Sequence, residues 1–206
     1  MLLTAAVANC APAWSQAAMK SILTGDTPLT WVGLDFSIAR LTTRADFAPL
    51  EGSGPAYFAR WNNLLETEAS KYDLTGALVL NYVKHATAMV RPFNDNVDLT
   101  KSWSAGDAAI DPEKIPALIQ RYDTQGHEGA GVVFIVSNLN KPQGRGDFYV
   151  VFFDMRSKEV LHSEMISGKP FGAGLRNFWA GAVNSVVKEI KGKYQKAWVA
   201  RYINGK

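Results

Sequence analysis

Two continuous apolar runs stand close together in the last third of the chain: GVVFIVSN begins at Gly131 and FYVVFFDM begins at Phe148. Runs of this length that are rich in β-branched and aromatic residues are typical of strands covered on both faces. A polar turn over residues 154–158 leads into a third stretch, EVLHSEMI, which begins at Glu159. Because short connections join neighbouring strands, this region predicts a three-stranded antiparallel meander.

A long amphipathic segment follows the meander. Its apolar residues recur at helical spacing and form one broad stripe: Leu175, Phe178, Trp179, Ala182, Val183, Val186, Val187, Ile190 and Tyr194. A stripe of this width predicts a closing helix that packs on the sheet.

The segment TWVGLDFSIARL, from Thr30, alternates with period two. It predicts a strand with one well-buried face, made of Val32, Leu34, Phe36 and Ile38. Asp35 falls on the opposite face, and a carboxylate in mid-strand needs polar partners if that face is covered. Asp35 therefore either pairs with a cation from a helix or lines a cleft, and both interpretations stay open.

Helical segments separate this strand from the meander. Pro55 and Pro112 each stand where the first turn of a helix begins. Residues 73–90 fit either one helix or a helix followed by a strand that ends near Val90. The order of elements predicts an α+β (mixed α/β) fold, with helices packed on a mixed sheet of about five strands, a C-terminal antiparallel meander and a closing helix.

The first eighteen residues, MLLTAAVANCAPAWSQAA, carry no charged side chain and are rich in alanine. They resemble the later part of a secretory signal peptide, which is cleaved after small residues. Cleavage after Ala17 divides the chain into a signal peptide over residues 1–17 and one globular domain over residues 18–206, and Ala13 offers a second cleavage position. We expect a periplasmic or secreted protein. The alternatives are a lipoprotein acylated at Cys10 and a cytoplasmic protein.

Charge and hydropathy limit the partners. The net charge is +3, and much of the positive charge lies in lysines near the end of the chain. No arginine-rich run accompanies stacking aromatic residues, so we interpret these lysines as solubilising and expect no nucleic-acid partner. We expect no transmembrane segment, because no stretch approaches the roughly 20 apolar residues that a membrane span needs. The oligomeric state stays open, since Trp14, Trp103 and Trp198 have no predicted place in the core.

Motifs for common chemistries are incomplete. His85, His127 and His162 form no HExxH pair, no GxSxG elbow is present, and the single cysteine, Cys10, belongs to no Cys/His cluster. The loop NDNVD lacks the glycine and the final acid of a calcium-binding loop. The tripeptide at residues 145–147, Arg-Gly-Asp, is expected on an exposed hairpin loop. We therefore predict no catalytic residue, no metal site and no cofactor.

A glycine-rich turn before the closing helix is the one candidate for ligand binding. Gly172 and Gly174 begin a GxGxxG pattern, but Asn177 stands where the third glycine should be. The helix N-terminus and the guanidinium of Arg176 could hold an anion such as phosphate. The preferred interpretation is that the glycines release a turn that lets the helix pack. If the turn does bind an anion, the predicted ligand-binding residues are Gly172, Gly174, Arg176 and Asn177. Asp35 is a further candidate.

The stretch DFYVVFFDMRSKEVLHSEM, followed by FWAGAVNSVVKEI, resembles the end of small exported accessory domains. Such domains include the penicillin-binding-protein activator lipoproteins and the amino-terminal domain of TolB, in which an apolar strand, a turn, another strand and a closing helix follow in this order. In that resemblance WVGLDFS is the first core strand. The resemblance implies a non-catalytic domain that binds envelope proteins, and it carries over no functional residue.

These observations lead to one expectation and one rival. We expect an exported soluble domain that binds an envelope protein or component without catalysis. The rival is a protein that binds a small anion, or an enzyme, with its site at the turn from Gly172 to Asn177.

Overall fold

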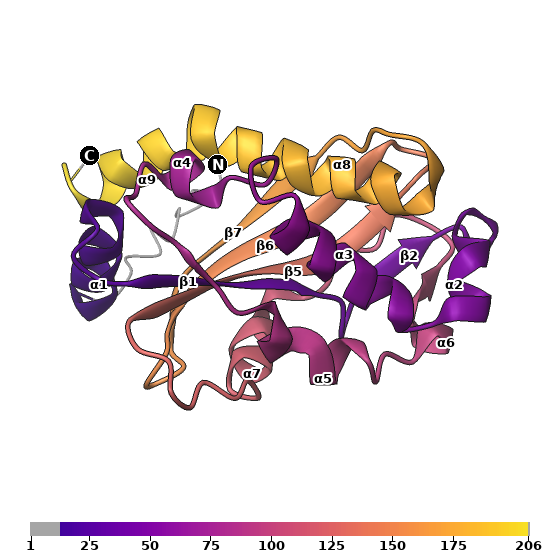
Figure 1. Cartoon of the computed structure of the whole chain (residues 1–206), viewed down its shortest axis with the longest axis horizontal. Helices are drawn as coiled ribbons and strands as arrows, with labels where there is room; N and C mark the ends of the chain where they lie inside the picture. Colours follow the sequence, from indigo (N-terminus) through magenta and orange to yellow (C-terminus); the bar gives the residue numbers. More distant parts are fainter. Residues whose placement is uncertain (1–12, 206) are drawn as a thin grey trace, which may run out of the picture.

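The computed structural model describes residues 13–205 as helices packed on both faces of one mixed β-sheet (Figure 1). The predicted α+β fold is confirmed. The helices are α1 (Ala13–Thr24), α2 (Ala48–Ser53), α3 (Ala56–Thr67), α4 (Leu74–Leu78), α5 (Arg91–Asn94), α6 (Leu99–Ser102), α7 (Ile115–Ile119), α8 (Gly174–Glu189) and α9 (Gln195–Tyr202). The 3₁₀ turns are η1 (Arg44–Phe47), η2 (Thr87–Val90) and η3 (Pro112–Lys114), and η4 (Ile190–Tyr194) is a π-helical turn.

The sheet has seven strands instead of about five. They are β1 (Leu29–Asp35), β2 (Arg40–Thr42), β3 (Lys84–His85), β4 (Trp103–Ser104), β5 (Ala130–Asn140), β6 (Arg145–Asp154) and β7 (Val160–Gly168). The predicted meander is present, because β5, β6 and β7 pair antiparallel in sequence order. On the other side of β5, β1 pairs with its first half and β2 with its second half, both in parallel. The two-residue strands β3 and β4 complete this side.

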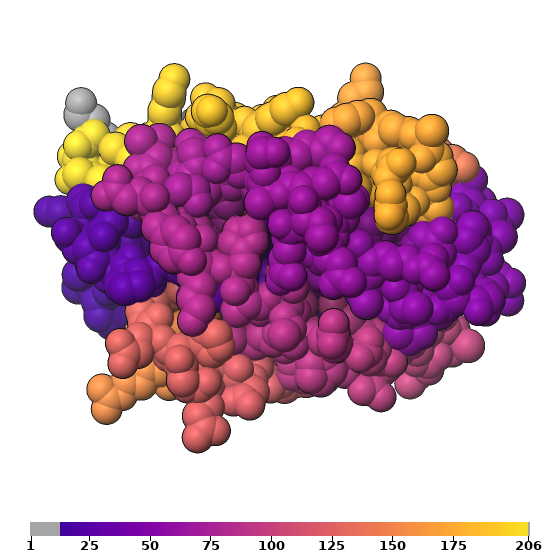
Figure 2. All heavy atoms as spheres, viewed as in Figure 1, coloured from indigo at the N-terminus to yellow at the C-terminus, as the bar shows by residue number. Residues whose placement is uncertain are grey.

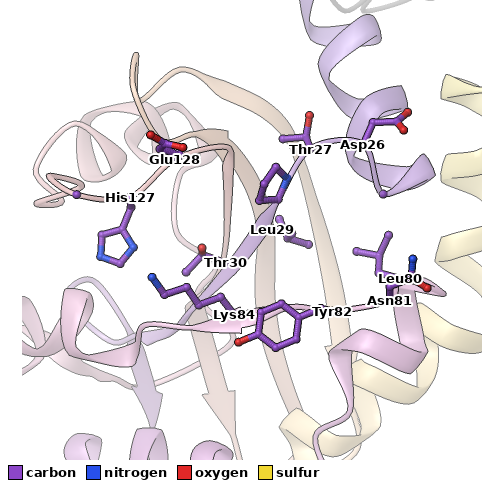
Figure 3. A pocket seen from close by; sticks show the side chains of 13 residues that line it. Asp26, Thr27, Leu29, Thr30, Leu80, Asn81, Tyr82, Lys84, His127 and Glu128 are labelled. Atoms are coloured by element: carbon purple, nitrogen blue, oxygen red, sulfur yellow. The ribbon is translucent and has the colours of Figure 1, made fainter.

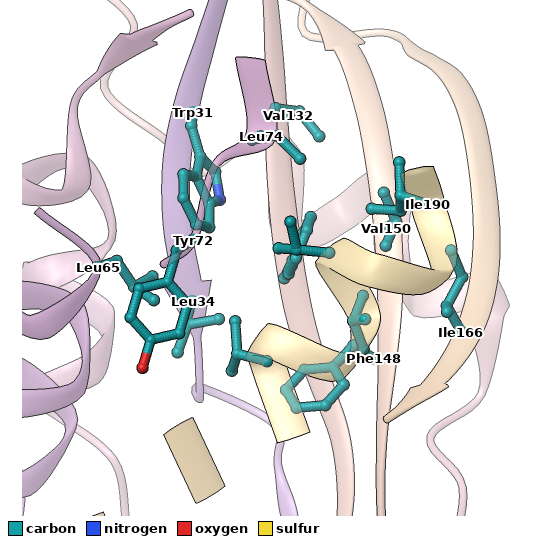
Figure 4. Packing of buried hydrophobic residues seen from close by; sticks show 14 of the residues in the cluster. Trp31, Leu34, Leu65, Tyr72, Leu74, Val132, Phe148, Val150, Ile166 and Ile190 are labelled. Carbon is teal, nitrogen blue, oxygen red and sulfur yellow. The ribbon is translucent and has the colours of Figure 1, made fainter. Parts of the chain in front are cut away.

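Two layers of helices cover the sheet. In Figure 1, α3, α8 and α9 lie above the sheet, and α5 and α7 lie below it. The upper core contains Trp31, Leu34, Val132 and Phe148, which meet Ile190 just beyond α8 (Figure 4). The lower core is smaller and packs strand residues against η2 and α7. The sheet is therefore apolar on both faces, as the continuous runs predicted.

The closing helix needs the π-helical turn to keep its apolar side inward. Val186, Ile190, Tyr194, Trp198 and Tyr202 follow one another at intervals of four residues and face the upper core. A stride of four residues drifts by about 40° around an α-helix, because each residue turns by about 100°. The wider turn of η4 takes up part of that drift. The stripe predicted from the sequence thus packs against the upper core to its end, where Tyr194 is partly buried.

The first core strand differs from its prediction. All seven residues of β1 are buried, so the strand is covered on both faces instead of one. An irregularity in register between Trp31 and Gly33 also interrupts the strict alternation. As a result Val32 packs in the lower core, whereas Leu34 and Phe36 pack in the upper core.

The region between β1 and β5 is more broken than expected. Residues 73–90 contain α4, the short strand β3 and the 3₁₀ turn η2, so the helix-then-strand alternative holds in outline. Residues 42–54 contain η1 and α2. Among the tryptophans without a predicted place, Trp198 is buried, Trp103 packs against the upper core and Trp14 is 46% exposed.

Helix α1 begins inside the predicted signal peptide. Ser15 is buried, and its hydroxyl donates a hydrogen bond to the carbonyl of Leu161 in β7 at 2.6 Å. The earlier part of that signal peptide, with Cys10, lies outside the described residues. Within residues 13–205 no helix is both long and apolar enough to cross a membrane.

Candidate functional site

The glycines of the predicted anion site occupy a turn that only glycine adopts readily. Gly172 has φ +114° and Gly174 has φ +76°, in the region that other residues rarely enter. A Cβ atom on Gly172 would lie 3.0 Å from the carbonyl oxygen of Asn177, and one on Gly181 would lie 2.2 Å from the carbonyl oxygen of Phe171. The close approach to α8 accounts for Gly172, and the positive φ accounts for Gly174, without a ligand.

Arg176 lies beside a shallow hollow of about 260 Å³ that Lys71, Tyr72 and the turn help to line. Its side chain donates to the amide oxygen of Asn177 at 3.2 Å, and its backbone carbonyl accepts a hydrogen bond from Trp61 at 2.8 Å. Burial raises the pKa of Tyr72 to about 12, Glu68 adds to that rise, and Arg176 opposes it. Four of the predicted site residues are therefore close together at the start of α8.

Asp35 does not belong to that group. Its carboxylate is buried on the lower face of the sheet, whereas α8 covers the upper face. One oxygen accepts a hydrogen bond from the hydroxyl of Tyr122 at 2.6 Å, and the other accepts one from the backbone N–H of Ser37 at 2.7 Å. The partner is thus a tyrosine beyond α7, neither the helix cation nor the open cleft that the sequence suggested.

The Arg-Gly-Asp tripeptide is also placed differently from its prediction. It begins strand β6 instead of lying on a loop, and Asp147 is buried. Its carboxylate accepts hydrogen bonds from Arg145 at 3.0 Å and from Ser167 at 2.6 Å. Arg145 also pairs with Asp107 at 2.7 Å. The tripeptide therefore fastens the loop that contains Asp107 to the sheet.

A larger hollow lies where the parallel strands begin, and we call it the amino-end pocket. Its volume is about 700 Å³, within the range of about 300–1,000 Å³ that is typical of ligand pockets. It is lined by Gly25, Asp26, Thr27, Pro28, Leu29, Thr30, Leu80, Asn81, Tyr82, Lys84, Gly126, His127 and Glu128. These residues come from the segments that lead into β1, β3 and β5, which meet at the left end of the molecule (Figure 2).

Close backbone packing fixes the wall between β1 and β5. Gly25 ends α1 at φ +82°, and the N–H of Asp26 donates back to the carbonyl of Ser21 at 2.9 Å, which is a helix-ending arrangement. A Cβ atom on Gly129 would lie 2.3 Å from the carbonyl oxygen of Pro28. The segments that precede β1 and β5 are therefore in direct backbone contact, so the folded chain itself fixes the position of this wall.

The opposite wall begins at Leu80, and the residue just before it, which ends helix α4, is strained. Val79 ends this helix with φ +60° and ψ +43°, the left-handed conformation that usually belongs to glycine. A β-branched side chain in this region costs roughly 1–3 kcal/mol. The side chain of Val79 is 71% exposed, so burial in the protein offsets little of that cost.

Tyr82 and Lys84 continue the same wall. The side chain of Tyr82 is 72% exposed, which is unusual for a large aromatic residue. Figure 3 shows Tyr82 and Lys84 on one side of the open space and Asp26 and Thr27 on the other. A large apolar ring is thus held at the rim of a polar pocket.

Charged groups of both signs line the pocket without neutralising one another. Within residues 13–205, Lys84, Asp26 and Glu128 take part in no ion pair. The carboxylate of Asp26 accepts a hydrogen bond from the Thr24 hydroxyl at 2.5 Å. The pocket can therefore offer an ammonium group to an anion and carboxylates to a cation at the same time.

His127 contributes a further polar atom. Its ring atom Nδ1 is buried and has no hydrogen-bond partner among the described residues. Buried polar atoms are nearly always paired, so this nitrogen is an exception beside the pocket. Within residues 13–205, no three His, Cys, Asp or Glu side chains are grouped so that they could hold a metal ion.

Sequence reasoning missed this pocket because its residues come from three loops that no motif connects. The only local signal was His127 within a polar stretch before β5, and nothing in the sequence indicates that Val79 ends a helix in a left-handed conformation. Comparison of the chain with models of protein families, with curated proteins and with solved structures gave no match.

Proposed function

We propose that this protein is an exported, non-catalytic binding module that holds an extended peptide segment of an envelope protein in the amino-end pocket. The observation that carries the proposal is the exposed Tyr82 in the pocket lining, together with the exposed Val79 that directly precedes this wall in the chain. Both side chains are more than 70% exposed, and Val79 is held in a strained conformation as well. Strain that the fold itself does not repay is common at binding sites, where a partner covers the exposed groups.

The polar lining favours a peptide over an apolar ligand. A peptide carries N–H and C=O groups along its length, and its side chains or termini bring both charges. Lys84 can meet a carboxylate, while Asp26 and Glu128 can meet an ammonium group or N–H donors. The ring of Tyr82 can cover an apolar side chain, as aromatic residues do in protein interfaces.

A library of random peptides displayed on phage tests this chemistry. We expect the protein to enrich binding peptides, and we expect Tyr82→Ala or Lys84→Ala to weaken the selected peptides at least tenfold. Arg176→Ala is the matched control, because it changes an exposed residue beside the other hollow. Failure to select any peptide, or peptides that bind the two pocket variants as well as the natural protein, would contradict the proposal.

The proposed export has its own test, so the two parts can fail separately. Cleavage after Ala17 would remove the first turn of α1, including the buried Ser15 that bonds to β7. We therefore propose cleavage before Trp14, the second of the two predicted positions. The intact mass of protein recovered from the periplasmic or secreted fraction identifies the first residue. A full-length chain confined to the cytosol would refute export and leave the peptide result untouched.

The anion-binding alternative rests on Arg176 beside the hollow of about 260 Å³. Phosphate or nucleotide would then raise the melting temperature of the natural protein but not of Arg176→Ala. We expect phosphate or nucleotide to change the melting temperatures of the natural protein and of Arg176→Ala equally, because the backbone of the turn accounts for Gly172 and Gly174 without a ligand.

A further inference from the structure

The two edges of the sheet are built differently. On the β1 side the edge consists of β3 and β4, which have two residues each. Short edge strands are one of the ways in which proteins prevent unwanted strand pairing. At the other edge β7 runs for nine residues and pairs with β6 alone.

Only the beginning of β7 is covered along its free edge. There the hydroxyl of Ser15, from α1, bonds to the carbonyl of Leu161 at 2.6 Å. The rest of the strand, from His162 to Gly168, has no strand partner on that side within the described part of the chain. The middle residue of this uncovered stretch is Met165.

The uncovered stretch carries no charge among its exposed side chains, which are Ser163, Met165 and Ser167. The one acid, Glu164, faces α9, where its carboxylate accepts a hydrogen bond from Trp198 at 2.7 Å. Lysine, proline or an outward charge would discourage pairing, and none stands at an outward position here.

Exposed apolar side chains follow the same edge. Met165 is 45% exposed in the middle of the strand, and Trp14 is 46% exposed next to Ser15 at its beginning. Of the other large exposed apolar residues of the described chain, Tyr82 lines the amino-end pocket, Val79 ends helix α4, and Phe171 lines the hollow beside Arg176. The edge of β7 is therefore a second apolar surface, separate from that pocket.

We propose that β7 pairs antiparallel with β7 of a second copy of this chain, about a two-fold axis at Met165. The axis falls there because α1 limits the free stretch to residues 162–168. This register places Ser163 opposite Ser167 and Met165 opposite Met165, while Glu164 lies opposite Ile166, so no like charges meet. It also brings the exposed Met165 side chains of the two copies together at the axis, so that each copy covers an apolar group of its partner.

Cysteine cross-linking tests the register. In a background with Cys10→Ser, Met165→Cys is expected to form a disulfide-linked dimer under mild oxidation, because opposite residues of antiparallel strands lie within disulfide reach. Ser163→Cys alone is expected to stay monomeric, whereas an equal mixture of Ser163→Cys and Ser167→Cys is expected to cross-link. Cross-linking of Ser163→Cys alone, or none at Met165→Cys, would overturn the proposed pairing.

Mass measurement tests the association itself. We expect light scattering of the natural protein to give twice the chain mass of 22.6 kDa at high concentration. Met165→Lys is expected to weaken dimerisation at least tenfold, while Ala105→Lys, an exposed position beside β4 at the opposite edge, leaves it unchanged. A single-chain mass at every concentration of the natural protein would refute the proposal, as would a dimer that Met165→Lys does not weaken.

Discussion

Tyr122→Phe removes one oxygen atom from the lower core and leaves Asp35 with an unpaired carboxylate oxygen. Both residues are 1% exposed, and their hydrogen bond measures 2.6 Å. A hydrogen bond to a charged group contributes roughly 1.5–3 kcal/mol, and water cannot replace the hydroxyl at a buried site. The ring would keep its packing against Phe93 and Phe153, whose centroids lie 5.4 and 5.9 Å away. We therefore expect the free energy of unfolding to fall by about 2 kcal/mol.

Urea denaturation at neutral pH measures this loss as a lower midpoint with an unchanged slope. Tyr82→Phe is the matched control, because it removes a hydroxyl from a tyrosine that is 72% exposed. A loss below about 0.5 kcal/mol, the size expected for a surface change, would show that Asp35 does not depend on Tyr122. Asp35 would then again be a candidate for ligand binding.

The pH dependence gives a second reading of the same pair. Burial, with the nearby Asp35 carboxylate, raises the pKa of Tyr122 well above its usual value of 10. The unfolded chain loses this proton near pH 10, whereas the folded protein keeps it, so stability falls as the pH rises above about 10. We expect the stability of the natural protein to fall more steeply there than that of Tyr122→Phe, so that the difference between them shrinks. An equally steep fall in both would contradict this assignment.

Three further changes test other parts of the structure. Val79→Gly should raise the free energy of unfolding by about 1 kcal/mol, because glycine relieves the left-handed strain, and a thermal melt that shows a loss would contradict that strain. Gly172→Ala should lower the free energy of unfolding by about 1 kcal/mol or more, since φ is +114° at this position. Gly192→Ala, in the π-helical turn η4, should leave the free energy of unfolding unchanged, so equal denaturation midpoints for the two variants would refute the difference. Hydrogen bonds from His162 and Trp198 lower the pKa of Glu164 below its usual 4.5. The ionised carboxylate therefore stabilises the folded protein above pH 4.5, and this stabilisation is lost as the pH falls through the lowered pKa. The natural protein should therefore be more stable than Glu164→Gln at neutral pH, with the difference shrinking in acid; a constant difference in urea midpoints from pH 7 to pH 3 would argue against it.

The sequence predicts the parts of the fold that depend on continuous patterns. The runs at Gly131 and Phe148 indicated strands covered on both faces, and the stripe from Leu175 indicated the closing helix; both are present. The alternation around Asp35 misled, because a register irregularity in β1 moves Val32 to the lower face and both faces are covered. Short elements such as β3 and β4 leave no pattern in the sequence, because two residues cannot show a period.

The candidate site was less predictable for a physical reason. Gly172 to Asn177 are neighbours in sequence, so their proximity could be inferred, and the hollow beside them is small. Asp35 could not be assigned, since its partner Tyr122 is far away in sequence and fits a helical apolar stripe equally well. The amino-end pocket forms where three loops meet. The position of that meeting point is set by the order of the strands in the sheet, which no local pattern in the sequence shows.

Site-specific photocrosslinking in cells that express the protein would show directly whether the amino-end pocket binds a partner. A photoreactive phenylalanine analogue replaces Tyr82 in one variant and Tyr57, a partly buried residue on α3, in a control. The proposed function predicts one discrete cross-linked protein from position 82 that is absent from position 57 and is lost when Lys84→Ala is added. No product at position 82, or the same product from both positions, would contradict binding at this pocket.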